Sequence, residues 1–309
     1  MSVNLKENIR FLLNSWMVDK FLKFLVYEKR FSRHTSLAYQ KDLNQFFSFI
    51  KAEFQIHTEQ SVVHIHLRAW VVSLLEAQLN PISVNRKIAC LKSYFKFLNA
   101  RGLLVKNPTS RIRPLKTEKK LPSFLRLSEM IQLLDHIDYE NSFSGRRDQL
   151  AIELLYASGI RLSELINLKE SDVNHYDGTL KVLGKRNKER LVPVNEFLIK
   201  MIKSFIIDYK QTAAGESKTY LLLTDKKKQM YPMFVYRLVQ KYLGQITTLK
   251  KRSPHVLRHT FATHMLDKGA ELNAVKDLLG HTSLAATQVY THNSMEKLKK
   301  TFDQAHPKA

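Results

Sequence analysis

Residues 255–292 read HVLRHTFATHMLDKGAELNAVKDLLGHTSLAATQVYTH, and this stretch decides how the rest of the chain is interpreted. It places Arg258 three residues after His255, a second histidine at His281, and Tyr290 nine residues beyond that histidine. No carboxylate joins these side chains at metal-ligand spacing, and no serine or cysteine stands where a histidine can activate it. Cations and imidazoles suit an anionic, oxygen-rich substrate, and a phenol can act as the nucleophile. The stretch therefore predicts a site at which a tyrosine attacks a phosphodiester.

Helices and one hairpin are predicted around this site. One helix starts at Ser253-Pro254 and ends near Asp267, and the next spans Leu272–Leu279. Upstream, two short β-like runs, Thr179–Leu183 and Arg190–Val194, flank a lysine-rich turn and predict a β-hairpin. Most other segments show helical spacing of apolar residues. The predicted fold class is mainly α with a small antiparallel β-sheet.

Two further cations are predicted to join the site from upstream. Arg161 follows Gly159, where one helix stops, and lies near the start of the next helix, where backbone donors favour anions. Glu164, three residues on, can hold its guanidinium in place. Arg161 and Arg258 can together clamp one phosphate, because each guanidinium can fork onto two oxygens. Lys185, at the tip of the hairpin, can protonate the leaving hydroxyl.

The first hundred residues predict a compact bundle of four amphipathic helices joined by short loops. Ser32 and Thr35 offer capping hydroxyls for the second helix, and Ser83 is predicted to cap the fourth. Two places in this bundle are basic and are expected to be exposed. They suit contacts with phosphates or a DNA groove, although a solvated helix face is the plainer interpretation of either one alone. The candidate DNA contacts are Arg33, Thr35, Asn85, Arg86 and Lys87.

Charge and composition point to a nucleic-acid partner. The chain of 309 residues carries 50 Lys and Arg against 28 Asp and Glu, a net charge of +22. Up to Pro114 there are 18 basic and 7 acidic residues, and the remainder has 32 and 21, so both parts are equally basic. A protein basic along its whole length is expected to grip a polyanion with both parts, although an ordinary basic soluble protein remains an alternative on charge alone.

The compartment is predicted from what the chain lacks. Its single cysteine, Cys90, cannot form an internal disulfide, which favours a reducing cytoplasm. The first residues contain no apolar run typical of a signal peptide, and no run approaches the roughly 18 residues that a membrane helix needs. We therefore expect a cytoplasmic protein without a membrane partner.

The segment from about Arg101 to Leu125 has three prolines, many lysines and no sustained periodicity, as is typical of a linker. The predicted organisation is an N-terminal helical DNA-binding domain (1–110), a linker (111–124) and a C-terminal catalytic domain (125–309).

Zinc binding is the competing interpretation of the histidines. His255 and His259 are four residues apart and His264 follows, but Val256 stands where the zinc-protease motif needs glutamate, and no third ligand is suitably placed. No metal site is predicted, and His259 and His264 are expected to be packing or surface histidines. A DNA-binding module with an idle site is a further alternative.

Four segments resemble those of a tyrosine recombinase of the phage-integrase superfamily, specifically the Xer type. YASGIRLSEL (Tyr156–Leu165) is similar to the first arginine box, and GKRNKERLVPV (Gly184–Val194) to the lysine hairpin. HVLRHTFATHML resembles the His-x-x-Arg box, and LLGHTSLAATQVYTH contains the second histidine and the tyrosine. The resemblance implies a catalytic set of Arg161, Lys185, His255, Arg258, His281 and Tyr290. Arg186 departs from the glycine common in Xer proteins, and we expect it to add a DNA contact.

The resemblance also implies the course of the reaction and the assembly. It implies a SAM-like core-binding domain followed by the catalytic domain, and a tail, Asn293–Ala309, that is amphipathic and basic (Leu298, Phe302) and packs onto a neighbouring protomer. Tyr290 is expected to form a 3′-phosphotyrosine intermediate, and strand exchange to pass through a Holliday junction, without metal or cofactor. The expected partners are double-stranded DNA with a specific recombination site, three further protomers in a homotetramer or in a heterotetramer with a paralogous recombinase, and a septal DNA translocase.

The biological role implied by the resemblance is the resolution of chromosome dimers. A mobile-element or integron-type integrase remains an alternative, because length and motifs overlap. A nicking-closing enzyme like the type IB topoisomerases is another, because it uses the same chemistry.

Overall fold

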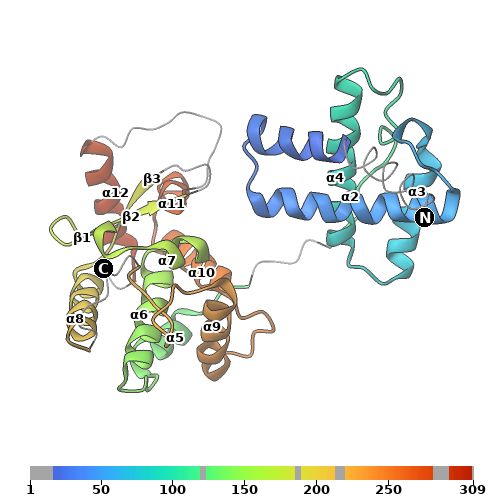
Figure 1. Cartoon of the computed structure of the whole chain (residues 1–309). Helices are drawn as coiled ribbons and strands as arrows, with labels where there is room; N and C mark the ends of the chain where they lie inside the picture. The colour runs from blue at the N-terminus through green and yellow to red at the C-terminus, as the bar shows by residue number, and fades with distance from the viewer. Residues whose placement is uncertain (1–16, 119–122, 185–188, 213–219, 281–291, 308–309) are drawn as a thin grey trace. The chain divides into compact units, whose positions relative to one another are not determined.

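The structure is a computed structural model that describes residues 17–118, 123–184, 189–212, 220–280 and 292–307 (Figure 1). The chain divides into two compact units, Met1–Lys120 and Leu121–Ala309. Each unit has its own hydrophobic core. Among the described residues, no helix is both long and apolar enough to cross a membrane.

The first unit is helical, as predicted. A helical segment at 17–23 continues into a π-helical turn, Phe24–Glu28, and is followed by α2 (Arg33–Phe54), a 3₁₀ turn (Glu59–Ser61), α3 (His64–Glu76) and α4 (Pro81–Ala100). Helices α2, α3 and α4 pack on one another pairwise. The largest side chains of their core are aromatic and fully buried: Phe21, Phe46, Trp70, Tyr94 and Phe95. Aromatic spacing in this bundle therefore serves packing.

The helix starts agree with the prediction at one place and differ at another. Ser32 caps α2 by accepting a hydrogen bond from the backbone N–H of Thr35 at 3.3 Å. The prediction that Ser83 caps α4 is wrong, because Asn80 accepts from the N–H of Ile82 at 2.9 Å. Proline fits the first position of a helix, where its missing N–H is not needed, so α4 already begins at Pro81. The basic residues of α4 consequently lie beyond its first turn.

The segment predicted as a linker is partly folded onto the first unit. Ile112 is buried in its core, and Leu115 packs against that core. The side-chain amide of Asn85 donates to the carbonyl of Leu115 at 2.9 Å and accepts from its N–H at 2.7 Å. Apolar side chains spaced among the prolines and lysines explain this docking, and the first unit extends past residue 110.

The second unit is mainly helical with a three-stranded antiparallel sheet, which confirms the predicted fold class. Strands β2 (Thr179–Leu183) and β3 (Glu189–Pro193) form the predicted hairpin, and β1 (Val173–Asn174), which was not predicted, pairs with β2. The helices are α5 (Leu127–Ile131, continued by a π-helical turn, Gln132–His136), α6 (Phe143–Ala157), α7 (Leu162–Asn167), α8 (Glu196–Thr212), α9 (Pro232–Ile246), α10 (Pro254–Asp267), α11 (Leu272–Leu279) and α12 (His292–Ala305).

Helix α6 lies at the centre of this unit (Figure 1). Its C-terminal half is completely buried, and it packs against α7, α8 and α10. Because α7 follows α6 after a few residues, the packing of α6 on α10 brings Arg161 near Arg258 although they are far apart in sequence. The central helix thus positions the site.

The C-terminal helix α12 packs on its own chain. Phe302 is fully buried, Leu298 is buried, and both belong to the core of the second unit. The ring of Phe302 stacks on His306 with centroids 4.7 Å apart. The tail that contains them was expected to pack onto a neighbouring protomer, and that contact stays a prediction. In the single chain α12 packs against α10, α11 and β3, because leaving its apolar face in water would forgo the burial of a large aromatic ring.

Candidate active site

Three arginine side chains converge on the C-terminal end of α11. Arg190 donates through Nε to the carbonyl of Leu278 at 3.0 Å, and Arg258 through Nη2 to the carbonyl of Leu279 at 2.5 Å. Arg161 donates through Nη2 to the carbonyl of Gly280 at 2.9 Å. The last carbonyls of a helix lack intrahelical partners and form its negative end, so they attract cations. Three consecutive carbonyls therefore gather guanidinium groups from β3, α10 and the start of α7.

Arg161 lies directly before α7, at its N-cap position. Its backbone N–H donates to Oε2 of Glu164 at 2.7 Å, and its Nη1 donates to Oε1 of the same carboxylate at 2.7 Å. This confirms the predicted role of Glu164 in holding the guanidinium. The Arg161 side chain is 21% exposed, so it remains accessible to a ligand from solvent.

Arg190 was not predicted to belong to the site. Its Nη1 and Nη2 donate to the two oxygens of Glu164 at 2.7 and 2.9 Å, and the residue is only 6% exposed. The sequence did indicate that Arg190 is buried, because it lies two residues before Val192 and therefore points to the same, core-facing side of β3. A buried arginine must be paired with a carboxylate, and Glu164 is that carboxylate.

Burial alone would raise the pKa of the Glu164 carboxyl, but the hydrogen bonds and charge of Arg190, with those of Arg161, hold that pKa at about 2. A folded-state pKa below that of the unfolded chain stabilises the fold above pH ~4.3, and this stabilisation is lost as pH falls towards 2. Glu164 is therefore charged throughout the physiological range.

The lowered pKa of Glu164 predicts how the stability of the second unit depends on pH. Between pH 4.5 and 2 we expect the second unit of the wild type to lose about 2.5 kcal/mol more unfolding free energy than Glu164→Gln, which has no carboxyl to titrate there. Urea unfolding at a series of pH values measures this difference. Equal pH dependence of the two proteins would contradict the assignment of a depressed pKa to Glu164.

Arg258 is more deeply enclosed than Arg161. It is 7% exposed, and its Nη1 donates to the carbonyl of Gly159 at 2.5 Å, which ties α10 to the turn between α6 and α7. Gly159 has φ +58° and lies against the ring of Phe261, so that a Cβ there would approach the ring to 2.5 Å. Burial and then the charge of Arg161 lower the pKa of Arg258 to about 10, which leaves it charged at neutral pH.

His255 lies on the first turn of α10 and is exposed. The ring is partly covered by the protein, and this partial burial, followed by the charges of Arg258, Lys251 and Arg161, lowers the pKa of His255. At neutral pH the imidazole is mainly uncharged and can accept a proton. The structure therefore brings together Arg161, His255 and Arg258, three of the six predicted catalytic residues.

The other predicted residues of this site lie outside the described part of the chain. They are Lys185 and Arg186, between β2 and β3, and His281 and Tyr290, between α11 and α12. Their placement stays a prediction. Of the described residues that flank them, Glu189 begins β3, the strand that carries Arg190, and Gly280 is the C-cap of α11, on whose end the three arginines converge.

His264, which was expected to be a packing or surface histidine, lies inside the second unit. Its Nδ1 is 2.9 Å from the hydroxyl of Tyr156, and its Nε2 is 2.9 Å from the carbonyl of Leu125. Because a carbonyl only accepts, Nε2 donates and Nδ1 accepts from the tyrosine. His264 is thus a buried packing histidine, as predicted. His259 is half-buried, beside the ring of Phe124.

The candidate DNA contacts of the first unit differ in exposure. Arg33, at the start of α2, is exposed, and the hydroxyl of Thr35 lies 3.0 Å from that of Ser32. Arg86 is also exposed and forms two hydrogen bonds with the carboxylate of Asp42.

The expectation that Lys87 is exposed is wrong. Its ammonium is buried and donates to Asp42 at 2.8 Å and to the side chain of Gln45 at 2.6 Å. Buried Asp42 needs a counter-charge within the bundle, and Lys87 supplies it. The side chain of Asn85 is also engaged within the protein, by the backbone of Leu115. The exposed cations among the candidates of the first unit are therefore Arg33 and Arg86.

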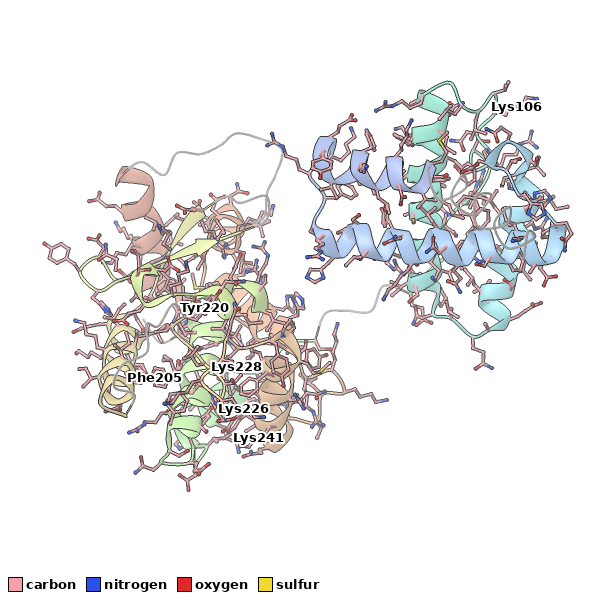
Figure 2. All side chains as sticks on the ribbon, viewed as in Figure 1. Lys106, Phe205, Tyr220, Lys226, Lys228 and Lys241 are labelled. Atoms are coloured by element: carbon pink, nitrogen blue, oxygen red, sulfur yellow. The ribbon has the colours of Figure 1, made fainter. Side chains whose placement is uncertain are left out.

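Further lysines add positive charge to the surface of both units. Figure 2 labels Lys106 in the first unit and Lys226, Lys228 and Lys241 in the second, and all four are exposed. Charge distributed in this way suits a polyanionic partner.

Comparison with known proteins agrees with this geometry. Residues 123–297 match the model of the phage integrase family, and residues 18–102 match that of the phage integrase N-terminal SAM-like domain. The chain is 38% identical over 293 residues to the tyrosine recombinase XerC of Pelobacter propionicus, covering 94% of this chain and 95% of that protein. It is 33% identical over 300 residues to the tyrosine recombinase XerD of Staphylococcus haemolyticus, covering 95% and 98%.

Solved structures share the fold. A XerH site-specific recombinase bound to palindromic difH substrate in a post-cleavage complex aligns with TM-score 0.67 and 20% identity, covering 92% of this chain and 93% of that one. The Tn1549 transposon integrase in complex with circular intermediate DNA aligns with TM-score 0.68 and 19% identity, covering 91% and 98%.

Proposed function

Because the chain belongs to the phage integrase family, and within it to the Xer-like tyrosine recombinases, it is a DNA breaking and rejoining enzyme, and we propose which residues perform its reaction. The observation that supports the proposal best is the convergence of two predicted arginines on the end of α11, next to His255. The proposed active site consists of Arg161, Lys185, His255, Arg258, His281 and Tyr290.

In the proposed reaction the Tyr290 oxygen attacks the scissile phosphate and forms a 3′-phosphotyrosine, while the 5′ oxygen leaves. Charge grows on the non-bridging oxygens in the transition state, and fixed cations stabilise it there more than in the ground state. Arg161 and Arg258 supply those cations. They are held before DNA binds, so little reorganisation is needed during the reaction.

Proton transfer in this scheme needs a base for the phenol and an acid for the leaving oxygen. His255, with its lowered pKa, is mainly neutral at pH 7 and suits the base. Lys185 suits the acid, and His281 is assigned to the phosphate oxygens. The phosphotyrosine ester preserves the energy of the broken bond, so religation needs no cofactor.

The partner is proposed to be double-stranded DNA with a specific recombination site. Exposed Arg33 and Arg86 are suited to its phosphates, and Lys87 holds the Asp42 carboxylate that Arg86 also binds. Thr35 and Asn85 at the same two places, and Arg186 after β2, are proposed as further contacts. The relatives include proteins named XerC and XerD, which supports the existence of a paralogous recombinase. The proposed assembly is a tetramer of one or two kinds of subunit around a Holliday junction. Chromosome-dimer resolution in the cytoplasm, together with a septal DNA translocase, is the proposed role.

Sequencing of DNA trapped on the protein tests this function. Covalent adducts captured from cells are digested, the attached peptide is identified by mass spectrometry and the DNA is sequenced. We expect attachment at Tyr290 through a 3′-phosphate, at one recurrent chromosomal sequence.

The other outcomes separate the alternatives. Adducts scattered without a common sequence would indicate nicking-closing activity, and adducts at the ends of mobile elements would indicate an integrase. Attachment at a different residue would reject the assigned nucleophile.

A further inference from the structure

We propose that Arg190 is a positioning residue for the recombination reaction, acting through Glu164 on Arg161 and through the Leu278 carbonyl on the end of α11. This role rests on the proposed active site, because it concerns the placement of that site's arginine. Arg190 itself is buried and is committed through Nε, Nη1 and Nη2 to groups of the protein. It therefore does not compete for DNA.

The first part of the argument concerns the Glu164 carboxylate, which Arg161 and Arg190 share. Oε1 accepts from Nη1 of both arginines at 2.7 Å. Oε2 accepts from the backbone N–H of Arg161 at 2.7 Å and from Nη2 of Arg190 at 2.9 Å. These four hydrogen bonds fill the acceptor sites of a carboxylate. The carboxylate can therefore neither rotate nor approach Arg161 more closely without breaking a bond to Arg190.

The second part concerns charge. A single carboxylate paired with Arg161 alone would form a neutral pair and weaken its attraction for phosphate. With Arg190 included, the three groups carry a net charge of +1, and Arg258 adds another. Because the transition state places more negative charge on the phosphate than the ground state, this surplus stabilises the transition state preferentially. Arg190 thus preserves the charge of the guanidinium that Glu164 orients.

The third part concerns connectivity. Arg190 lies on β3, five residues after Lys185 in the sequence, and its side chain packs against Gly280, which precedes His281 in the sequence. A Cβ at Gly280 would approach the Arg190 Cδ to 3.0 Å, so side chain and backbone are in close contact. One buried side chain therefore ties β3 to the C-terminal end of α11.

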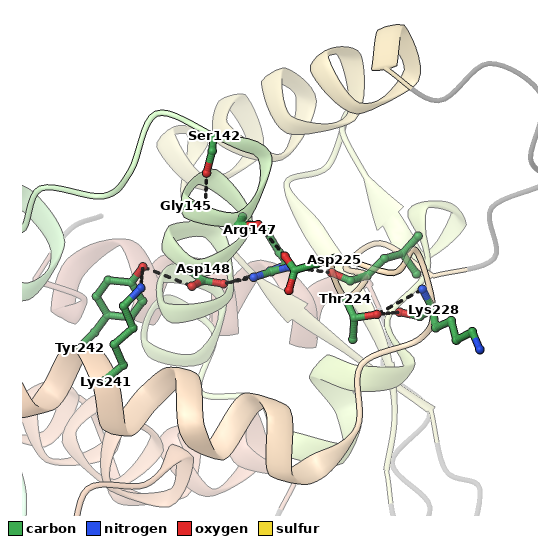
Figure 3. Close-up of polar contacts among 11 residues, drawn as sticks. Ser142, Gly145, Arg147, Asp148, Thr224, Asp225, Lys228, Lys241 and Tyr242 are labelled. Carbon is green, nitrogen blue, oxygen red and sulfur yellow. Dashed lines mark hydrogen bonds and ion pairs between the residues drawn. The ribbon is translucent and has the colours of Figure 1, made fainter.

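Arg147 offers a matched control in the same unit (Figure 3). It is 3% exposed, its Nε and Nη2 donate to Asp148 at 2.9 and 2.7 Å, and its Nη1 donates to Asp225 at 2.7 Å. Tyr242 completes this network by donating to Asp148 at 3.2 Å. Arg147→Gln removes a buried guanidinium that is paired with carboxylates, as Arg190→Gln removes one that is paired with Glu164. Its partners, however, do not contact Arg161 or α11 in any hydrogen bond of the described residues.

The test measures DNA affinity and the single-turnover rate of covalent adduct formation separately. It uses full-length protein and a nicked duplex with the DNA sequence recovered from the covalent adducts. For Arg190→Gln we expect affinity within about twofold of wild type and a rate about 10- to 100-fold lower, the range typical of residues that orient a reacting group. The double variant Glu164→Gln/Arg190→Gln is expected to be no slower than the slower single variant, because both act on Arg161 as one unit. Arg147→Gln is expected to lose thermal stability but to keep the rate.

An Arg190→Gln protein that cleaves at the wild-type rate would overturn the inference, as would an equal loss of rate in Arg147→Gln. If Arg190→Gln does not fold, Arg190→Lys decides. Its ammonium keeps the charge but cannot reach both Glu164 oxygens and Leu278 together. We expect a rate below that of the wild type, and a wild-type rate would contradict a positioning role. Absence of adduct with the wild type would instead overturn the proposed function itself.

Discussion

Replacing Tyr290 by phenylalanine is expected to abolish covalent attachment to DNA, with strand cleavage reduced on the order of 10⁴-fold or more. The substitution removes only the phenolic oxygen, which is the proposed nucleophile, and keeps the ring. Without that oxygen no phosphotyrosine can form, and the two arginines have no attacking group to assist. SDS-stable protein–DNA complexes on a nicked duplex measure the effect, and an equilibrium binding assay is expected to show unchanged affinity.

The matched control is Tyr176→Phe, which removes a phenolic oxygen from the β1–β2 turn, where the side chain is 97% exposed. It should form adduct at the wild-type rate. Persistence of the adduct in Tyr290→Phe would mean that another group is the nucleophile. If even the wild type forms no adduct on any tested duplex, the chain binds DNA with an idle site, and the enzymatic proposal fails.

Replacing Arg258 by glutamine is expected to lower the rate of cleavage about 10²- to 10³-fold, the usual effect of losing one preorganised donor at a developing negative charge. Glutamine retains one donor group but no charge, and it cannot bridge the Gly159 and Leu279 carbonyls as Arg258 does. Both the phosphate contact and the tie between α10 and α11 are therefore lost. Single-turnover cleavage at saturating protein isolates the chemical step from binding.

Two comparisons sharpen this prediction. Arg147→Gln has the same loss of a buried guanidinium elsewhere in the unit and should cleave normally. The double variant Arg161→Gln/Arg258→Gln should lose less than the product of the single losses, because both arginines hold one phosphate. Cleavage by Arg258→Gln within about threefold of the wild type would remove Arg258 from the catalytic set.

Local rules explain where prediction of the fold succeeded. Apolar spacing identified α2, α3 and α4, and α11 agrees with the predicted bounds, Leu272–Leu279. The cap of α4 was predicted wrongly, because two local signals competed and Pro81 begins the helix before Ser83. Strand β1 has two residues and no periodicity of its own, so it forms only through pairing with β2. Short elements of this kind depend on their neighbours.

For the functional residues, too, some predictions succeeded and others failed. Residue types and spacing nominated Arg161, His255 and Arg258, and the fold brings these three together. The exposure of individual side chains was predicted less well than their chemistry, since Lys87 is paired with Asp42 inside the bundle. Whether a lysine faces solvent depends on which carboxylate the folded chain buries beside it, and Asp42 is on another helix.

The sequence by itself determined the helical class of the fold and the reacting groups, because helical periodicity and side-chain chemistry are local properties of the chain. Only the tertiary structure decided how the arginines are held. The carbonyls of Leu278, Leu279 and Gly280 accept from arginines that come from three separate elements. Hydrogen bonds need donor and acceptor within about 3 Å, and that proximity arises only when β3, α7, α10 and α11 are packed together.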